Sequence, residues 1–549
     1  MTSAPGVPAI TDIAFVSGAN DLNQWIDTRE IPRAEVPSER ISADALNAAV
    51  SHLQGTSVIS AQLNSEGFID SPEGRADRLP DVIDVRVQIR GDRRTTNLTL
   101  WAPLRWNGRL LAVGGGGNRT SPLWVKEPAM TAPTLADGVR NGFVTASTDG
   151  GNQDSRFFAW GLDEATGDID WELTNNWAYG ATHQLAVISK LLTEAIYGAA
   201  PVYSYMMGAS GGGRQTLATA QKHPEDFDGY WAECPAINWS KMSIAQLWPA
   251  IVMKDLKNPV PSARFAAMRE AAIAALDTED GVEDGLLWRS DFPVWDPSPA
   301  IGTETEAGPV TELDVEVMRL IWDGPRTSDG QQLWYGLPVG AESWNEYMPV
   351  GMLNCHEVDS VLEPDPFFLT KDWASSWIMR DPSFDWRTVT MENFGEMFHR
   401  SVQMFADYDF SDSDLTGVRD AGGKVLISHG MGDEVIPPQG TVEYHERVVE
   451  TMGGRTATAE FFRVFLLPGH GHSSLKGYGP GLSLADGMTA LMHWVESDTA
   501  PGAILATHVR DSDDLVDLRR PVLPYPAVAN YTSGDPSVPS SWNSEGTRP

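Results

Sequence analysis

One short segment, YMMGASGGGRQ at residues 205–215, constrains the fold of this chain more than any other. An apolar run leads into G-A-S-G-G at 208–212, and a helical pattern follows at 213–222. The pattern G-x-S-x-G between a strand and a helix predicts a nucleophile elbow, a tight turn that holds Ser210 in a strained conformation and needs small neighbours. A glycine-rich turn with an incidental serine is the alternative, and the flanking strand and helix favour the elbow.

Apolar runs with strand or helix periodicity recur on both sides of this segment. We expect strands at residues 82–89, 97–101, 109–113, 143–147, 203–207, 229–232, 424–428 and 461–467, and helices at 43–53, 177–197, 213–222, 263–276, 438–452 and 482–495. Strands that alternate with helices predict a mostly parallel α/β sheet with helices on both faces. With the elbow, this pattern favours an α/β-hydrolase core.

The alternation stops in the middle of the chain, where Trp, Pro and Asp are frequent. The sequence therefore predicts a catalytic core made of residues 81–235 and 409–535, interrupted by an inserted lid domain at 236–408. Residues 1–80 are expected to pack on the core as an N-terminal segment, and residues 536–549 to form a poorly ordered tail.

Composition excludes several classes of partner. The 549 residues include 75 acidic and 40 basic side chains, a net charge of −35, which disfavours binding to nucleic acid and to anionic membranes. No basic and apolar leader and no long apolar span is visible, so we expect a cytoplasmic protein; a secreted protein whose signal peptide is absent from this sequence is the alternative. Cys234 and Cys355 are expected to be free thiols, with a disulfide as the alternative. The oligomeric state stays open.

A serine nucleophile needs a base and an orienting acid, which follow it in the order Ser, Asp, His in this fold. The strand at 424–428 leads into a turn that ends at Asp433, with Glu434 as the neighbouring alternative. The strand at 461–467 leads into PGHGH, where His472 matches the usual position better than His470. The candidate catalytic residues are Ser210, Asp433 and His472.

An oxyanion hole needs two N–H donors. Gly211, directly after the serine, is the first candidate, and the glycine run at 114–117 supplies the second, with Gly115 and Gly116 as candidates. A phosphate cradle is the rival interpretation of this run. It is disfavoured because no P-loop pattern is present and Arg119 replaces the last glycine of G-x-G-x-x-G.

An acidic loop, LDTEDGVEDGLL at 276–287, stands inside the predicted lid. Its carboxylates at Asp277, Asp280 and Asp284 are hard oxygen ligands on a glycine-containing loop, which suits Ca²⁺. On spacing alone, a solvated acidic turn is slightly favoured.

Taken together, these motifs resemble the tannase and feruloyl esterase family. The resemblance covers about residues 101–531 and implies an α/β-hydrolase core, a large lid with the substrate pocket, and a triad at Ser210, Asp433 and His472. It rests on WNGRLLAVGGGG (106–117), FVTASTDGG (143–151), GASGGGRQTLATAQKHPEDFDGYWAECPA (208–236), HGMGDEVIPPQGTVEYHERV (429–448), PGHGH (468–472) and RPVLPYPAVANY (520–531).

The resemblance also implies a structural Ca²⁺ ion, bound by three Asp side chains and two backbone carbonyls. The matching positions are Asp277, Asp280 and Asp284 with the carbonyls of Val282 and Leu286. We therefore expect calcium in the lid and no organic cofactor.

One departure from the family concerns its disulfide. Family members typically carry a cysteine before the serine and another after the histidine, whereas this chain has Ala209 and Ser473; Leu523 replaces a further cysteine. The loss fits a reducing compartment, and it implies that packing and hydrogen bonds alone hold His472.

The expected function is hydrolysis of a small aromatic carboxylic ester, phenolic or hydroxycinnamoyl-like, through an acyl-enzyme. An acyltransferase with the same acyl-enzyme and a catalytically silent hydrolase-like binding protein are the alternatives; the complete triad argues against the second. Lid aromatics suit a planar acyl group and equally suit an ordinary core: Trp322, Trp334, Trp344, Phe367, Phe368, Trp373 and Trp377.

Overall fold

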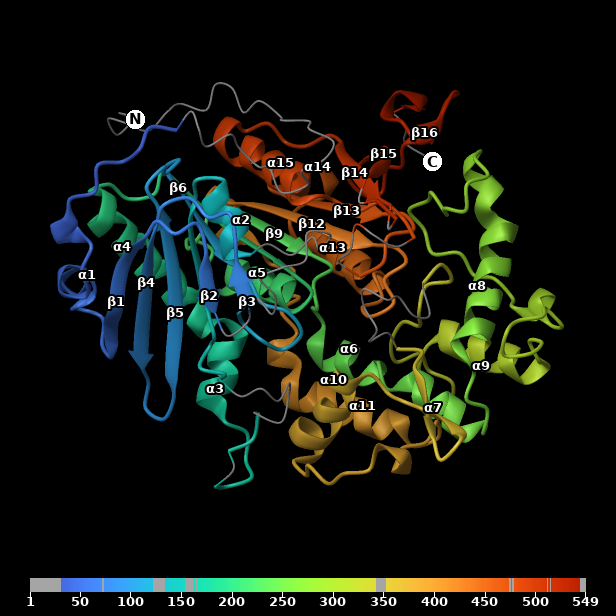
Figure 1. Cartoon of the computed structure of the whole chain (residues 1–549). Coiled ribbons are helices and arrows are strands. Elements are labelled where there is room, and N and C mark those ends of the chain that lie inside the picture. The colour runs from blue at the N-terminus through green and yellow to red at the C-terminus, as the bar shows by residue number, and fades with distance from the viewer. Residues whose placement is uncertain are drawn as a thin grey trace.

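The structure, a computed structural model, describes residues 31–71, 74–121, 134–153, 161–163, 165–341, 352–472, 475, 478–510, 512–513 and 515–543. Within these residues, a nine-stranded sheet of order β1-β4-β5-β7-β6-β8-β9-β12-β13 forms the centre of the molecule (Figure 1). The strands are β1 (Thr56–Asn64), β4 (Val82–Arg90), β5 (Thr95–Pro103), β6 (Arg109–Val113), β7 (Val144–Thr148), β8 (Tyr203–Ala209), β9 (Gly229–Glu233), β12 (Lys424–Gly430) and β13 (Phe462–Leu467).

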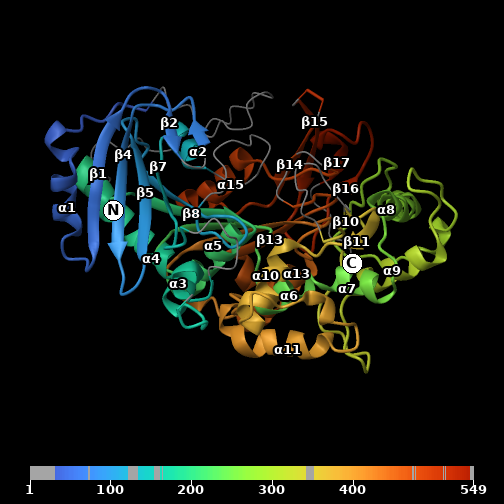
Figure 2. The same cartoon turned by 60° about the horizontal axis from the view of Figure 1, so that its bottom comes forward.

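The strands from β7 to β13 in this order are parallel, which confirms the mostly parallel sheet. At the other end β1, β4 and β5 are antiparallel. For β4 and β5 the cause is the short link at residues 91–94, which can only reverse the chain. Both views place these three strands at the end of the sheet far from α8 and α9 (Figures 1 and 2). Since β1 pairs with β4, the core sheet begins at Thr56 and not at residue 81.

In the central strand β8, alternating side chains pack against helices on opposite faces of the sheet. Met206 packs on the face that buries α4 and α5, whereas Tyr205 and Met207 pack on the face that buries α15. The predicted coverage of both faces is therefore present. The three helices are α4 (Ala181–Tyr197), α5 (Gly211–Lys222) and α15 (Leu484–Ser497).

Residues 234–423, here called the insertion, follow β9 and precede β12 in the sequence, although these two strands are neighbours in the sheet. The described part of the insertion lies below and beside the sheet (Figure 2). The sequence predicted one helix here, at 263–276, and the structure has several. Trp373 and Trp377 are fully buried with ring centroids 5.0 Å apart, so these two aromatics form core. The α-helices of its described part are α6 (Trp239–Ala245), α7 (Trp248–Asp255), α8 (Ser262–Leu276), α9 (Glu312–Asp323), α10 (Phe368–Asp372), α11 (Phe394–Phe405) and α12 (Thr416–Asp420).

The C-terminal segment corrects one prediction. Residues 536–543 are not a poorly ordered tail, because β17 (Trp542–Asn543) pairs with β16 (Asn530–Tyr531). The Trp542 ring is buried 5.2 Å from that of Trp288, and the Arg520 guanidinium lies 4.5 Å from its centroid. This tertiary packing overrides the polar composition. Two more strands, β14 (Ile504–Val509) and β15 (Val516–Val522), form a hairpin nearby.

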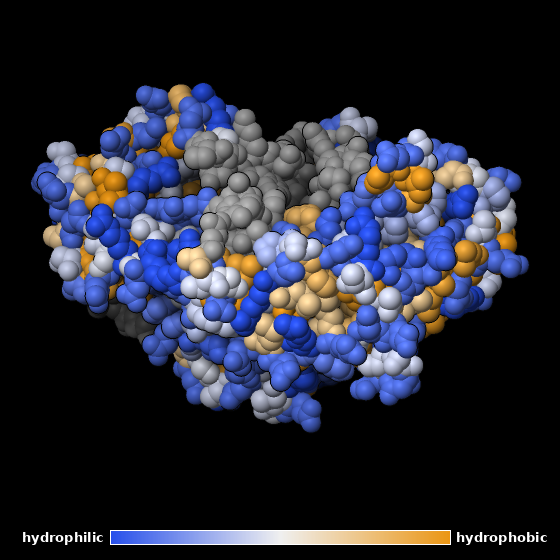
Figure 3. Space-filling model, turned by 90° about the horizontal axis from the view of Figure 1, so that it is seen from below, coloured by the Kyte–Doolittle hydropathy of each residue, from blue (hydrophilic) through white to orange (hydrophobic). Residues whose placement is uncertain are grey.

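The surface seen from below is largely polar (Figure 3). The described part of the face in Figure 3 is mostly hydrophilic, with apolar residues in small groups. No described helix combines the length and the apolar character that a membrane span requires.

Candidate active site

The turn between β8 and α5 has the backbone of a nucleophile elbow. Ser210 has φ 57° and ψ −119°, a strained region for a residue with a side chain, and the residue is partly exposed. Its N–H donates to the Glu233 carbonyl oxygen at 2.9 Å, which ties the turn to the end of β9. The sequence pattern and the backbone therefore agree at this position.

Glycines surround Ser210 because another loop packs directly on the elbow. A Cβ atom on Gly211 would overlap the carbonyl oxygen of Gly117, and one on Gly212 would overlap that of Gly115. On Gly208 it would collide with the backbone of Gly212. The loop after β6 thus lies against the first turn of α5, where an oxyanion loop should be.

The structure corrects one of the candidate oxyanion donors. The N–H of Gly115 donates to the Gln215 side-chain oxygen at 2.8 Å, so this N–H is not available to a substrate. Gly116 remains a predicted donor, together with Gly211. The first N–H groups of α5 have no acceptor within the helix and lie at its positive end, which favours a developing negative charge.

The loops after β12 and β13 bring the predicted acid and base together. His472 Nδ1 lies 2.8 Å from Asp433 Oδ2, and both side chains are buried. Asp433 Oδ1 accepts the N–H groups of Val435 and Ile436, each at 2.8 Å. Because β8, β9, β12 and β13 are parallel, both loops leave the sheet at the same edge as Ser210.

Asp433 and His472 each stabilise the charged form of the other. Burial raises the pKa of Asp433, but His472 and His429 outweigh it and hold that pKa well below its ordinary value. Burial lowers the pKa of His472, but Asp433 and the nearby Cys234 outweigh it and hold that pKa well above 6.5. The carboxylate therefore stays ionised and orients the imidazole.

The two alternatives named from the sequence have other contacts. Glu434 accepts the backbone N–H of His472 at 3.1 Å, so it positions the loop and not the imidazole. His470 Nε2 lies 3.9 Å from the Glu233 carboxylate, and burial lowers the pKa of His470 to about 4. Of these candidates, Asp433 and His472 are the acid and the histidine that contact each other.

Cys234 is the residue of this site that sequence reasoning missed. One ligand-type atom each of Cys234, Asp433 and His472 lies within 4.8 Å of the others. The pairing of β8 with β9 brings Cys234 to the site, because it places the residue after Glu233 beside Ser210. Neither Cys234 nor Cys355 is in a disulfide. Ser473 lies outside the described residues.

The acidic loop presents its carboxylates to its own backbone. Asp280 accepts the N–H groups of Val282 and Trp288 at 2.9 Å, and Asp284 pairs with Arg520. Burial, with the charges of Asp284 and Asp277, raises the pKa of Asp280 to about 6. The ligand atoms of Asp277, Asp280 and Asp284 are not grouped within 4.8 Å of one another, unlike those of Cys234, Asp433 and His472. The donor set fits a hard cation.

A cavity of about 510 Å³ borders the loops that carry Asp433 and His472, although its lining does not include the triad. Trp322 of the predicted lid aromatics lines it, and Trp344 lies outside the described residues. The lining includes Met431, Gly432 and Gly469 of these loops and the aromatic residues Phe292, Trp295, Trp322, Tyr335 and Tyr478.

Residues 82–544 match the family model described as tannase and feruloyl esterase. The chain belongs to this family. A probable feruloyl esterase of Arthroderma benhamiae is 33% identical over 469 residues, 84% of each chain. The mono(2-hydroxyethyl) terephthalate hydrolase of Piscinibacter sakaiensis is 27% identical over 519 residues, 82% of this chain and 81% of the relative.

Solved structures of family members share the fold. The tannin acyl hydrolase of Aspergillus niger superposes with a TM-score of 0.77 at 23% identity, covering 92% of this chain and 95% of the other. Feruloyl esterase B of Aspergillus oryzae gives 0.75 at 21% identity, covering 91% and 99%. The predicted α/β-hydrolase class is confirmed, and as a member of this family the chain is a carboxylic ester hydrolase.

Proposed function

We propose that this esterase works through an acyl-enzyme on Ser210, with His472 as the base and Asp433 as the orienting acid. The observation that carries the proposal is the 2.8 Å contact between His472 Nδ1 and Asp433, at the sheet edge where Ser210 follows β8. Asp433 accepts the Nδ1 proton, so Nε2 is the ring nitrogen that would take the serine proton.

In the proposed reaction, Ser210 Oγ attacks the ester carbonyl while His472 takes its proton. The N–H groups of Gly211 and Gly116 stabilise the oxyanion. His472 then protonates the departing alkoxide and the acyl-enzyme forms. A water molecule, deprotonated by His472, attacks the acyl carbon, and collapse of the second oxyanion releases the acid and regenerates Ser210.

We propose a small aromatic ester as the substrate, and the insertion as the lid that binds it. Two indole rings of the cavity, Trp295 and Trp322, have centroids 6.2 Å apart, and Tyr335 adds a third ring. Flat aromatic groups pack well in such a lining. The named relatives, a feruloyl esterase and a terephthalate ester hydrolase, support this class.

We also propose that Asp277, Asp280, Asp284 and the carbonyls of Val282 and Leu286 hold Ca²⁺. The ion would supply structural charge compensation and no reaction step. Leu287, the last residue of the loop, and Arg289, two residues further on, line the cavity, so calcium would brace the cavity wall.

The substrate proposal is tested with matched aryl and alkyl esters, for example methyl esters of hydroxycinnamic, benzoic and hexanoic acids. Trp322→Ala should lower kcat/KM for aryl esters about tenfold more than for alkyl esters. Trp171→Ala, which removes an exposed tryptophan away from the cavity, is the control. Equal losses for both ester classes would contradict aryl recognition in this cavity.

The acyltransferase alternative is tested by product analysis with added alcohols or amines. Hydrolysis predicts free acid as the main product. Dominant transfer to an acceptor at low acceptor concentration would overturn the hydrolase assignment.

A further inference from the structure

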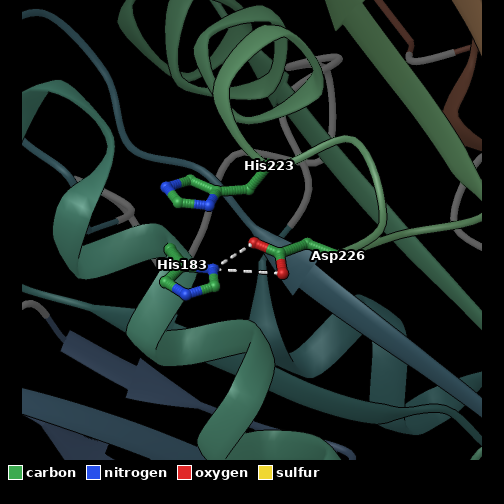
Figure 4. Close-up of side chains that lie close together, drawn as sticks. All are labelled: His183, His223 and Asp226. Atoms are coloured by element: carbon green, nitrogen blue, oxygen red, sulfur yellow. Dashed lines mark hydrogen bonds and ion pairs between the residues drawn. The ribbon is translucent and has the colours of Figure 1, made fainter. Parts of the chain in front are cut away.

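Two histidines and an aspartate meet at the end of α5 that lies away from Ser210. His183 is on α4, His223 directly follows α5, and Asp226 lies three residues further along (Figure 4). Ser210 directly precedes the 12 residues of α5, and at 1.5 Å per residue the two ends of the helix are about 18 Å apart. This cluster is therefore separate from the active site.

The three side chains converge. His183 Nδ1 lies 2.9 Å and 3.1 Å from the two carboxylate oxygens of Asp226. The rings of His183 and His223 are stacked, with centroids 3.8 Å apart and planes 13° from parallel. One nitrogen of each histidine and one oxygen of Asp226 lie within 4.8 Å of one another, and Figure 4 shows the rings and the carboxylate side by side.

We propose that His183, His223 and Asp226 bind a divalent transition-metal ion, with Zn²⁺ as the best fit. Two imidazole nitrogens and one carboxylate oxygen form a donor set that Zn²⁺ prefers. Ligand atoms on a tetrahedral Zn²⁺ lie about 3.3 Å apart, so the His183–Asp226 pair is nearly in place and rotation of the His223 ring completes the set. His183 is 39% exposed, which leaves room for water as a fourth ligand.

Two features favour a cation at this position and oppose the nearby positive charges of Lys190 and Lys222. The cluster lies at the C-terminal end of α5, which carries the negative end of the helix dipole. The net charge of −35 raises the local concentration of cations around the protein.

A metal ion here would join α4 to the link between α5 and β9. His183 comes from α4, whereas His223 and Asp226 come from that link. Ion binding to the folded state alone raises stability by mass action. The site is therefore a structural clamp on the helix that carries the nucleophile, and it takes no part in the reaction.

The test uses the full chain, stripped with a chelator and then restored in Ca²⁺, and titrates Zn²⁺ by calorimetry and by the rise in Tm. We expect one equivalent of Zn²⁺ to bind tightly and to raise Tm. His223→Ala and Asp226→Asn should each weaken it at least about tenfold. His52→Ala, which removes an exposed histidine elsewhere, should leave it unchanged. Far-UV circular dichroism without zinc checks that the variants fold.

Cys234, Asp433 and His472 form a second group that could bind zinc. Measuring ester hydrolysis distinguishes binding at the two sites. Zinc on the triad would inhibit ester hydrolysis, while zinc at the proposed site would raise Tm without inhibition. The proposal is overturned if the wild-type chain binds no Zn²⁺, or if His223→Ala and Asp226→Asn keep the tight equivalent.

Discussion

His472 contacts Asp433 across two loops that are distant in sequence, with Nδ1 of the imidazole 2.8 Å from Oδ2 of the carboxylate. The contact is possible because β12 and β13 are neighbours and parallel, so their following loops leave the same sheet edge. Two backbone N–H groups hold the other carboxylate oxygen. The position of the acid is therefore set before any substrate binds.

This contact predicts the pH dependence of catalysis. His472 must be neutral to act as a base, and its pKa is held well above 6.5, so kcat/KM should rise with pH to above 6.5. Asp433→Asn removes the charge that raises this pKa. The acidic limb should then move to lower pH, and kcat should fall about 10⁴-fold. If the acidic limb of kcat/KM lies at the same pH in the wild-type chain and in Asp433→Asn, the assigned role of Asp433 is contradicted.

The packing of the oxyanion loop on the elbow predicts a severe effect of one methyl group. Gly211→Ala would push its Cβ into the carbonyl oxygen of Gly117, so the loop must move. We expect kcat to fall at least about 100-fold, the usual effect of losing an oxyanion donor, with a lower Tm. Gly502→Ala, where the added Cβ meets nothing, is the control. Normal kcat in Gly211→Ala would show that this loop does not form the oxyanion hole.

The local patterns were predictable from sequence, and the reasons are visible at Ser210. Strand, serine and helix follow one another within the 205–215 segment, so periodicity and glycine spacing carry the information. Asp433 and His472 were predictable because each follows a strong strand. These features depend on neighbours in the sequence.

The features that sequence missed depend on tertiary contacts. Cys234 reaches His472 because β9 lies between β8 and β12, an order that no local pattern encodes. Trp542 is buried by Trp288, so the C-terminal segment is ordered despite its polar composition. The N–H of Gly115 is occupied by the side chain of Gln215 on α5, a contact that the sequence does not reveal.

The acidic loop predicts an effect of calcium on stability. A chelator should lower the Tm of the wild-type chain, because the proposed Ca²⁺ ion would bind the folded state and not the unfolded chain. Asp280→Asn should lose this response, whereas Asp329→Asn, on the insertion surface, should keep it. kcat should change much less than Tm. An unchanged melting curve in excess chelator, with no metal found by elemental analysis, would contradict the calcium proposal.

The cysteines predict tolerance of reducing agents. Cys234 and Cys355 form no disulfide, and Cys355 Sγ lies 3.6 Å from the Val260 carbonyl oxygen. Dithiothreitol should therefore leave activity unchanged, and Cys355→Ser should behave like the wild-type chain. A large loss in dithiothreitol that reverses on reoxidation would show that the two cysteines pair and that the pair is required.

The central claim is that Ser210 becomes acylated. The most direct measurement is peptide mass spectrometry of the enzyme after reaction with a fluorophosphonate, and after rapid acid quench with an aryl ester. We predict a single covalent adduct on the peptide that contains Ser210, absent in Ser210→Ala, which should also lose ester hydrolysis to the residual level of a triad mutant. An adduct on another residue such as Cys234, or a Ser210→Ala enzyme within about tenfold of wild-type activity, would contradict the account.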